Sequence, residues 1–118
     1  MSTLRVNTLA NQGGTQSTAI ENAINGSAKA WVNFNGTGTV AIRASYNVSS
    51  ITDNGTGNYT VNFTNAMPDA NYSASLSGGV NSRFNETGTI ATTSLQVLCR
   101  GSGGSLADID TVLVAIFR

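Results

Sequence analysis

Alternation of apolar and polar residues with a period of two is the feature that most constrains the fold of this chain. In GNYTVNFTNAMPDANYSASLSGG, residues 57–79, two such runs flank a turn at Pro68 and Asp69. The first run alternates apolar residues with Asn and Thr, and the second alternates them with Ser. This pattern predicts two half-buried strands joined as a β-hairpin. The solvent face of the predicted hairpin is unusual because it carries amides and hydroxyls instead of Lys and Glu.

The same period continues on both sides of this stretch, from Ala28 to the end of the chain. Strands are expected at residues 28–34, 40–46, 57–64, 72–77, 89–94, 95–100 and 111–118. The pattern predicts an all-β fold, an antiparallel sandwich or a barrel-like meander of about seven strands. In a simple up-and-down order, the turns at 35–39, 64–71 and 92–94 would share one end. The long connections at 47–57, 77–88 and 101–110 would share the other.

The strand expected at TVLVAIFR, residues 111–118, is apolar on both faces. Such a strand is covered on both sides, so it is either central in the sheet or has one face in a subunit interface. We expect its second face, which Leu113, Ala115 and Phe117 form, to contribute to an oligomer interface. In the strand VAIRASY, residues 40–46, the side chains of Val40, Ile42, Ala44 and Tyr46 are expected to point inward.

Residues 1–27 form a separate N-terminal segment ahead of a β-rich head domain, residues 28–118. The segment has a strand-like stretch, TLRVNTL, and a piece that suits one or two helical turns, with Ser17 or Thr18 as N-cap and Gly26 as stop. Its few apolar residues cannot build a core. We expect it to dock on its own domain, on sister chains through Leu4 and Val6, or on another protein.

Charge is scarce: 10% of the residues are charged, with six basic and six acidic side chains. The basic residues are scattered along the chain, which argues against a nucleic-acid partner. Membrane insertion is not expected, since no apolar run approaches the roughly 20 residues of a membrane span. The first residues lack the basic and apolar regions of a secretory signal, so we expect synthesis in a cytoplasm.

Catalytic and metal-binding patterns are weak. The chain has no His, and Cys99 is its one cysteine, expected to be a buried thiol. Asp108 and Asp110 in SLADID are the remaining option for paired carboxylates or a cation site, but Asp before a strand is more typical of turn chemistry. We therefore expect no enzyme activity, no metal and no cofactor. Trp31 is either packed at an interface or an exposed stacking platform.

Two stretches resemble a known family. STLRVNTLANQGGT is similar to the short opening element of tail-fibre and related virion proteins of marine and cyanobacterial phages. The runs KAWVNFNGTGT and SYNVSSITDNGTGNYTVNFTNAMPDANY resemble a module at the C-terminal ends of such proteins, with looser similarity through TTSLQVLCR to TVLVAIFR. The resemblance implies a virion structural protein with an antiparallel β fold, commonly a homotrimer on fibres or spikes that touch the host surface. Some 27 residues precede the module here, where a tail fibre usually carries a long shaft.

These observations favour a short trimeric tail fibre or fibre tip, made in the host cytoplasm and attached to other virion proteins by its N-terminal segment. Its long connections are expected to contact host surface polysaccharide. The candidate contact residues are Tyr46, Asn47, Asn54, Asn81, Arg83 and Asn85. The alternative is a capsid or tail decoration or spike protein that stabilises the particle and recognises no receptor. A small depolymerase is a third hypothesis, disfavoured by the missing His.

Overall fold

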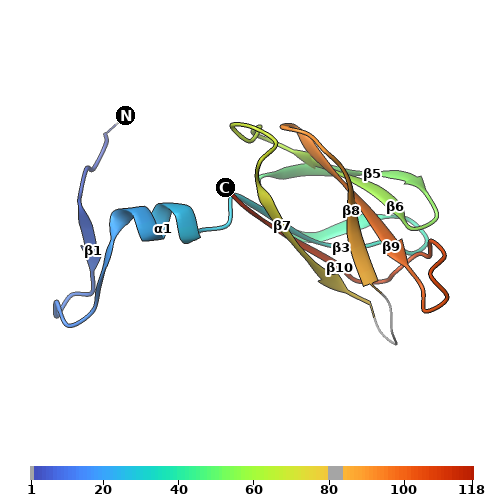
Figure 1. Cartoon of the computed structure of the whole chain (residues 1–118), viewed down its shortest axis with the longest axis horizontal. Coiled ribbons are helices and arrows are strands. Elements are labelled where there is room, and N and C mark those ends of the chain that lie inside the picture. The colour runs from blue at the N-terminus through green and yellow to red at the C-terminus, as the bar shows by residue number, and fades with distance from the viewer. Residues whose placement is uncertain (1, 80–83) are drawn as a thin grey trace.

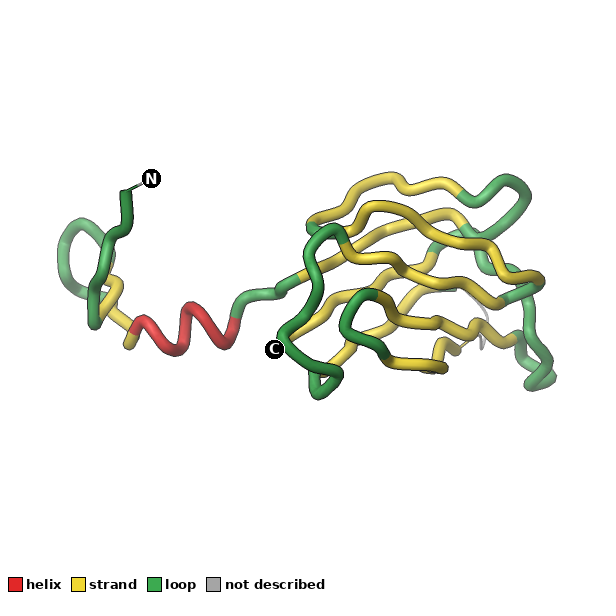
Figure 2. The backbone as a smooth tube through the Cα atoms, turned by 90° about the horizontal axis from the view of Figure 1, so that it is seen from above, coloured by secondary structure: helices red, strands yellow, loops and turns green. Residues whose placement is uncertain are grey.

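The computed structural model describes residues 2–79 and 84–118. An N-terminal hairpin and helix lie apart from a β-sandwich, and the molecule measures 51 × 29 × 24 Å along its principal axes (Figures 1 and 2). The C-terminus lies at the end of the sandwich where the chain enters from the helix (Figure 1). We call this the proximal end and the opposite one the distal end.

The sandwich consists of two four-stranded antiparallel sheets, as the all-β prediction requires. One sheet has the order β4 (Ala41–Tyr46), β3 (Ala30–Asn35), β10 (Val112–Phe117) and β7 (Ser73–Gly78). The other has the order β5 (Val48–Gly55), β6 (Asn58–Phe63), β9 (Ser94–Arg100) and β8 (Phe84–Ile90). The sheets are open and pack face to face, so the barrel alternative is wrong.

The core lies between the sheets and is made by alternate residues of each strand. Phe34, Tyr59, Leu95 and Ile116 are fully buried in it, and the Phe34 and Tyr59 rings meet edge to face with centroids 5.3 Å apart. Cys99 is a buried free thiol, as predicted. The alternation therefore places one apolar layer from each sheet against the other, as in other sandwiches.

The segment predicted as a connection at 47–57 is the strand β5, and this changes the order of the ends. Gly36 N–H donates to Ile109 O at 2.9 Å, which places the 35–39 turn beside the 101–110 connection at the distal end. Met67 N–H donates to Thr92 O at 2.8 Å, so the 64–71 and 92–94 turns do share the proximal end. Because β5 is an additional strand, the chain reverses direction once more than predicted. The 35–39 turn therefore lies at the distal end, opposite the 64–71 and 92–94 turns.

The hairpin predicted for residues 57–79 is wrong in its pairing, although both strands exist. β6 pairs with β5 and β9, whereas β7 pairs with β10 in the other sheet. The connection between them crosses from sheet to sheet, and its buried Met67 and Tyr72 close the proximal end of the core. The Tyr72 hydroxyl donates to Ala91 O at 2.9 Å and to Ser94 O at 3.0 Å, which ties this connection to the β8–β9 turn.

β10 is central in its sheet, one of the two predicted alternatives; its inner face is buried, whereas Leu113 and Ala115 on its outer face are half-buried and Phe117 is exposed in the single chain. β4 departs from the prediction because its register shifts opposite Asn33 and Phe34, with Ile42 paired to Phe34 and Ala44 to Asn33. This bulge turns Ala44 and Tyr46 to the outer face, and only the part of the strand before it faces the core. Tyr46 is accordingly 57% exposed.

The N-terminal segment forms a small hairpin followed by a helix. β1 (Thr8–Ala10) pairs with β2 (Ser17–Ala19), and α1 (Ile20–Gly26) follows directly. Ser17 and Thr18 lie in β2, so the predicted N-cap is wrong; Ala19 occupies that position without a side-chain cap. Every residue of α1 is exposed or partly exposed, and its main contacts are with β1 and β2. The segment therefore stands beside the sandwich without sharing its core.

Candidate functional site

The outer surface of the β4-β3-β10-β7 sheet has an apolar centre, which Asn33 interrupts and the serines of β7 border. Trp31 pairs with Tyr46 on one side and with Ala115 on the other, so these three side chains form a row across the sheet. Leu113 and Ala44 flank Asn33 in the next row. We call the following residues the apolar face: Trp31, Ala44, Tyr46, Leu113, Ala115 and Phe117.

Large parts of these side chains meet solvent in the single chain. Trp31 is 40% and Phe117 36% exposed, while Leu113 and Ala115 are half-buried in the sheet surface. A hollow of about 200 Å³ lies between Trp31, Leu113 and the hydroxyls of Ser75 and Ser77. Three expected interface residues thus share a surface with two aromatic residues. Leu4 and Val6, the other two, lie in the N-terminal segment and are exposed.

Amides and hydroxyls cover the outer surface of β5, β6 and the first part of β9, whereas Leu98, Arg100, Phe84 and Glu86 lie on the rest of this sheet surface. Register places Thr60 between Thr52 and Gln96, and Asn62 beside Ser94. We call the following residues the amide–hydroxyl face: Ser50, Thr52, Asn54, Asn58, Thr60, Asn62, Ser94 and Gln96. The alternating Asn and Thr of β6 in the sequence signalled this surface. The sequence did not indicate the β5 residues of this face, because the pattern predicts a connection at 47–57.

Hydrogen bonds between neighbouring strands hold the amide–hydroxyl face in place. Asn62 Nδ2 donates to Ser50 Oγ at 3.1 Å and to Thr52 Oγ1 at 2.9 Å. Asn54 Nδ2 donates to Thr60 Oγ1 at 2.8 Å. These bonds run across the strand direction, so the side chains form a ladder with few free rotations.

Gln96 extends this ladder toward β8. Its Nε2 donates to Asn58 Oδ1 at 2.9 Å, and its Oε1 accepts from Thr89 N–H at 3.0 Å. The amide lies against Gly88, where an added Cβ would be 2.3 Å from Gln96 Oε1. Beside it is a hollow of about 300 Å³ lined by Asn54, Thr60, Thr89, Ser94 and Gln96. All five lining side chains are uncharged amides or hydroxyls.

The residues proposed to contact a receptor do not come together in one patch. Tyr46 is exposed at the proximal end of β4, while Asn54 lies on the amide–hydroxyl face. Asn85 Nδ2 donates to Ser77 O at 2.8 Å, which links β8 to β7. Asn81 and Arg83 lie outside the described residues. Two of the three connections predicted to contact a receptor are largely strands: β5 occupies most of 47–57, and β8 begins within 77–88.

Asn47 has a structural role in the fold. It is the single residue between β4 and β5, which belong to different sheets, and its φ of 55° is in the left-handed region that Asn tolerates. Its Nδ2 donates to Lys29 O at 3.0 Å and Asn65 O at 3.1 Å, and its Oδ1 accepts from Asn65 N–H at 2.7 Å. The side chain therefore ties the sheet-to-sheet link to two neighbouring segments.

Tyr59 holds the 101–110 connection, which we call the distal connection, in place by hydrogen bonds. The Tyr59 hydroxyl lies 2.6 Å from Gly36 O and 2.9 Å from Asp108 Oδ1, and Asp108 Oδ1 also accepts from Gly57 N–H at 2.8 Å. Burial, with the hydrogen bond and charge of Asp108 in addition, raises the pKa of Tyr59 far above its usual value. The contact of Asp108 with Tyr59 and Gly57 joins two segments far apart in the sequence, so it is a long-range tie and not the local turn bond that was predicted. Among the described residues, no cluster of three His, Cys, Asp or Glu side chains is suited to hold a metal ion.

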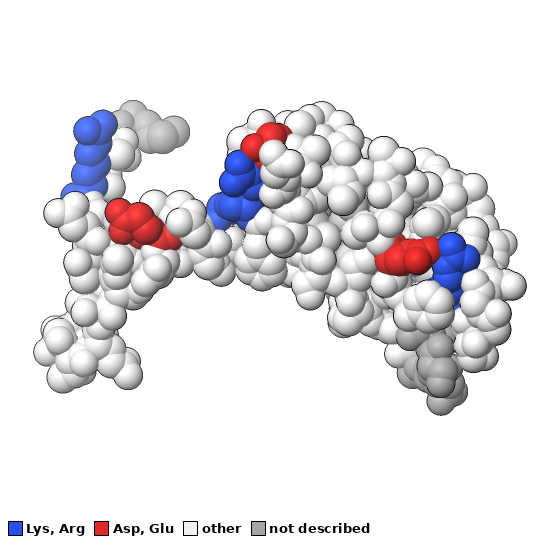
Figure 3. Space-filling view, viewed as in Figure 1, with Lys and Arg blue, Asp and Glu red and all other residues white. Residues whose placement is uncertain are grey.

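Charged side chains border both faces: Glu86 and Arg100 lie on the same sheet surface as the amide–hydroxyl face, and Arg43 bonds to Asn33 beside the apolar face. Arg100 pairs with Glu86 at 2.6 Å, and Arg118 pairs with Asp69 at 2.7 Å. The Arg118 guanidinium and the Asn71 N–H lower the pKa of Asp69 to about 2. Much of the sandwich surface in Figure 3 is free of charge. Ionic repulsion between two copies is accordingly weak.

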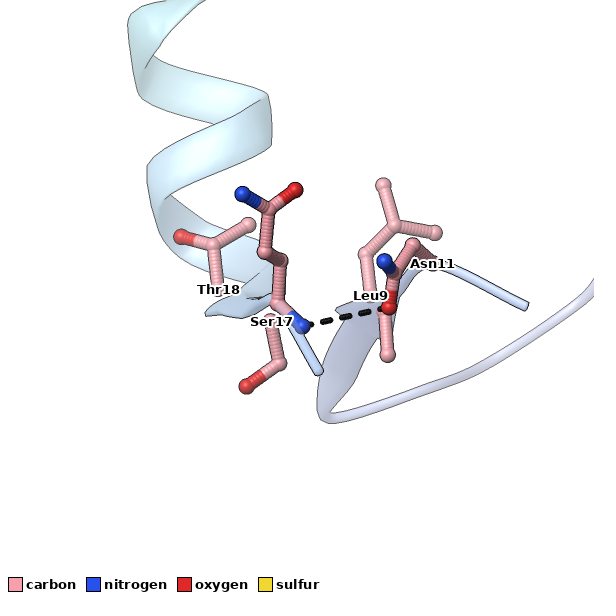
Figure 4. Close-up of a pocket in the computed structure, with 6 residues that line it drawn as sticks. Leu9, Asn11, Ser17 and Thr18 are labelled. Carbon is pink, nitrogen blue, oxygen red and sulfur yellow. Dashed lines mark hydrogen bonds between the residues drawn. The ribbon is translucent and has the colours of Figure 1, made fainter. Parts of the chain in front are cut away.

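The N-terminal hairpin has a hollow of about 380 Å³ between its strands. Leu9 and Asn11 lie opposite Ser17 and Thr18 (Figure 4), and Asn11 Oδ1 accepts from Gln16 N–H at 3.1 Å. Leu9 is 53% exposed. This hollow belongs to a segment whose apolar side chains lie open to solvent.

Comparison of the chain with models of known protein families, with curated proteins and with solved structures finds no match in any of the three. In the described part of the chain, the helix falls short of the length and apolarity needed to cross a membrane.

Proposed function

We propose that this chain is a structural protein of a phage virion, a short homotrimeric tail fibre or fibre tip. The sandwich is its outward head and contacts polysaccharide of the host surface. The N-terminal segment attaches the head to other virion proteins. The phage context and the trimer come from the sequence resemblance, whereas self-association is supported by the molecule itself.

The observation that carries the proposal is the apolar face. Trp31, Tyr46 and Phe117 are large apolar side chains that a single chain leaves 36–57% exposed on one sheet. Contiguous exposed apolar surface of this kind marks an interaction site. Aromatic residues near the centre of such a surface contribute most to association. A second copy of the same chain offers the same apolar surface, beside which Arg43 Nη1 donates to Asn33 Oδ1 at 3.2 Å.

The N-terminal segment supports attachment to a partner. Leu4 is 86% exposed, and Leu9 and Ile24 are more than half exposed. A hairpin of two three-residue strands and a seven-residue helix are too small to be stable without packing against a larger surface. Sister chains or another virion protein supply that surface in the assembled particle.

The proposal is tested by the mass of the purified full chain in solution. We expect sedimentation velocity to give a trimer, and Leu113→Lys to give a folded monomer, because it places a charge in the centre of the apolar face. Thr52→Lys, an exposed substitution on the opposite face, is the matched control and should remain trimeric. A wild-type monomer at high micromolar concentration would contradict the proposal, as would a trimeric Leu113→Lys variant.

A second function, the decoration protein, is favoured by one observation. Asn47, Asn54 and Asn85 all donate hydrogen bonds within the head, so these proposed receptor residues are engaged by the fold itself. A cryo-EM map of the virion distinguishes the two functions. A fibre tip lies at the tail and its loss prevents adsorption. A decoration protein has a copy number that follows capsid symmetry, and its loss leaves adsorption unchanged.

A further inference from the structure

We propose that the amide–hydroxyl face binds a neutral polysaccharide, with the hollow at Asn54, Thr60, Thr89, Ser94 and Gln96 as the subsite for one sugar unit. The inference rests on the proposed function, because it identifies the surface through which the head contacts a host glycan. It moves that contact from the connections at the ends of the sandwich to the face of one sheet.

The lining has the hydrogen-bonding character that sugar hydroxyls require. Each sugar hydroxyl both donates and accepts, and amide and hydroxyl side chains do the same. Among the described residues, Asn54 Oδ1 and the Ser94 hydroxyl have no protein partner, whereas Asn54 Nδ2 and Gln96 Nε2 are held by the network. Two groups therefore remain for a ligand: the Asn54 amide oxygen, which the bonds of Nδ2 orient, and the Ser94 hydroxyl, which is free to rotate toward a ligand.

The network also lowers the cost of ordering the site. Asn54, Asn58 and Gln96 are long or polar side chains whose immobilisation ordinarily opposes binding. Here Asn58 Oδ1 accepts from both Asn54 Nδ2, at 3.4 Å, and Gln96 Nε2, at 2.9 Å. The three side chains are thus positioned before any ligand arrives.

Other classes of ligand fit this face less well. A protein partner is expected to bury apolar or aromatic anchors, and the five lining residues are all polar. A charged polymer needs opposite charge, yet the nearby Arg100 is paired with Glu86 at 2.6 Å. The hollow of about 300 Å³ is at the small end of ligand sites, which suits a single sugar ring of a longer chain.

The first experiment follows side-chain amide signals of the ¹⁵N-labelled full chain by NMR. The probes are three neutral glycans, dextran, mannan and laminarin, with dextran sulfate as the charged comparison. We expect one or more neutral glycans to shift the Asn54, Asn58 and Gln96 amides at millimolar repeat-unit concentration. The Asn33 amide, on the opposite face, should stay in place. Shifts with dextran sulfate alone, at Asn33 alone, or with none of the glycans overturn the inference.

The second experiment removes the hydroxyls while keeping the shape of the face. The double variant Thr60→Val with Ser94→Ala should bind the responsive glycan roughly tenfold more weakly, since it deletes two hydrogen-bonding groups. The matched variant Ser75→Ala with Ser77→Ala lies on the opposite sheet and should bind like the wild type. Equal affinity of both variants contradicts the proposed site.

Failure of this inference and failure of the proposed function give different results. A trimeric chain located in the virion that gives no glycan shift overturns the binding site and leaves the virion role intact. A monomer absent from the virion that still gives shifts at Asn54 and Gln96 retains the site and overturns the virion role.

Discussion

The Tyr59 hydroxyl should fix the distal connection, and Tyr59→Phe tests this directly. The substitution removes one oxygen and leaves the ring, whose edge-to-face contact with Phe34 stays in place. Gly36 is buried, so its carbonyl oxygen loses a donor at 2.6 Å that water cannot easily replace. Asp108 loses a donor at 2.9 Å, but it is exposed and regains water.

The buried carbonyl group of Gly36 accounts for most of the expected decrease in the free energy of unfolding. An unsatisfied buried polar group costs about 1–3 kcal/mol, and a hydrogen bond to a charged group is worth about 1.5–3 kcal/mol before solvent compensates for it. Because Asp108 is solvated, we expect the free energy of unfolding to fall by about 2 kcal/mol. We also expect faster amide hydrogen exchange at Gly57 and Ala107, whose N–H groups bond to Asp108 Oδ1 and Cys99 O.

Urea denaturation at neutral pH measures the change, with the slope of the transition unchanged. Tyr46→Phe, compared in the Leu113→Lys background that is expected to be monomeric, is the matched control, because it removes the same oxygen from a side chain that is 57% exposed in the single chain. The control should differ from Leu113→Lys alone by less than about 0.5 kcal/mol. A Tyr59→Phe effect as small as that of the control, with unchanged exchange at Gly57, would refute the anchoring argument.

Two further predictions concern alkaline stability and backbone geometry. Burial raises the pKa of Cys99 to about 11 from 9.0, and raises the pKa of Tyr59 and Tyr72 above 10.0. Above about pH 9 the unfolded chain therefore loses protons that the native state keeps, so the free energy of unfolding should fall by up to about 1.4 kcal/mol per pH unit for each group. Denaturant titrations show this decline, and a flat profile from about pH 8 to about pH 11 would contradict it. Gly78 has a φ of +120°, and an added Cβ would lie 2.1 Å from Thr111 O, so Gly78→Ala should cost about 2 kcal/mol or more. Gly103→Ala, where a Cβ meets open space, should stay within about 0.5 kcal/mol, and similar melting temperatures for the two would oppose this reading.

The sequence predicted the four central strands and the edge strands β4 and β7, but not β5 or the first part of β8. β3, β6, β9 and β10 lie inside their sheets, and each alternates regularly between buried and less buried residues. A central strand has two neighbours that fix its register, so its inward positions must all be apolar. These four strands were placed within a few residues of their bounds.

Edge strands follow the pattern less strictly because one side is unpaired. β5 carries register shifts near both ends, and its inward positions are reduced to Val48 and the half-buried Ile51. Its remaining residues are polar, and Asn54-Gly55 is typical of a turn, so the sequence pattern predicts a loop here. The sequence of the first part of β8, FNETG, also predicts a loop.

Pairing between strands could not be read from alternation alone. A strand that turns back within its own sheet and one that crosses to the facing sheet both keep one apolar face inward. Residues 64–72 are compatible with either geometry, so the alternation alone predicts a hairpin at 57–79 where the strands in fact lie in different sheets. The amide–hydroxyl face could not be predicted for the same reason. It exists only because β5, β6 and β9 are neighbours in one sheet, and alternation does not show which strands are neighbours.

The two outer faces lie on opposite sides of the sandwich, and this arrangement makes the two proposals compatible. A copy that associates through the apolar face keeps its amide–hydroxyl face directed away from the contact. In a trimer, three such faces would then be displayed on one particle at fixed separation. Hydrogen bonds to sugar hydroxyls compete with water and are individually weak. Simultaneous contact by several faces multiplies a weak affinity, so an uncharged face that binds poorly as a monomer can still hold a polysaccharide surface. The apolar face would therefore set the number of copies, and the number of copies would set the strength of glycan binding.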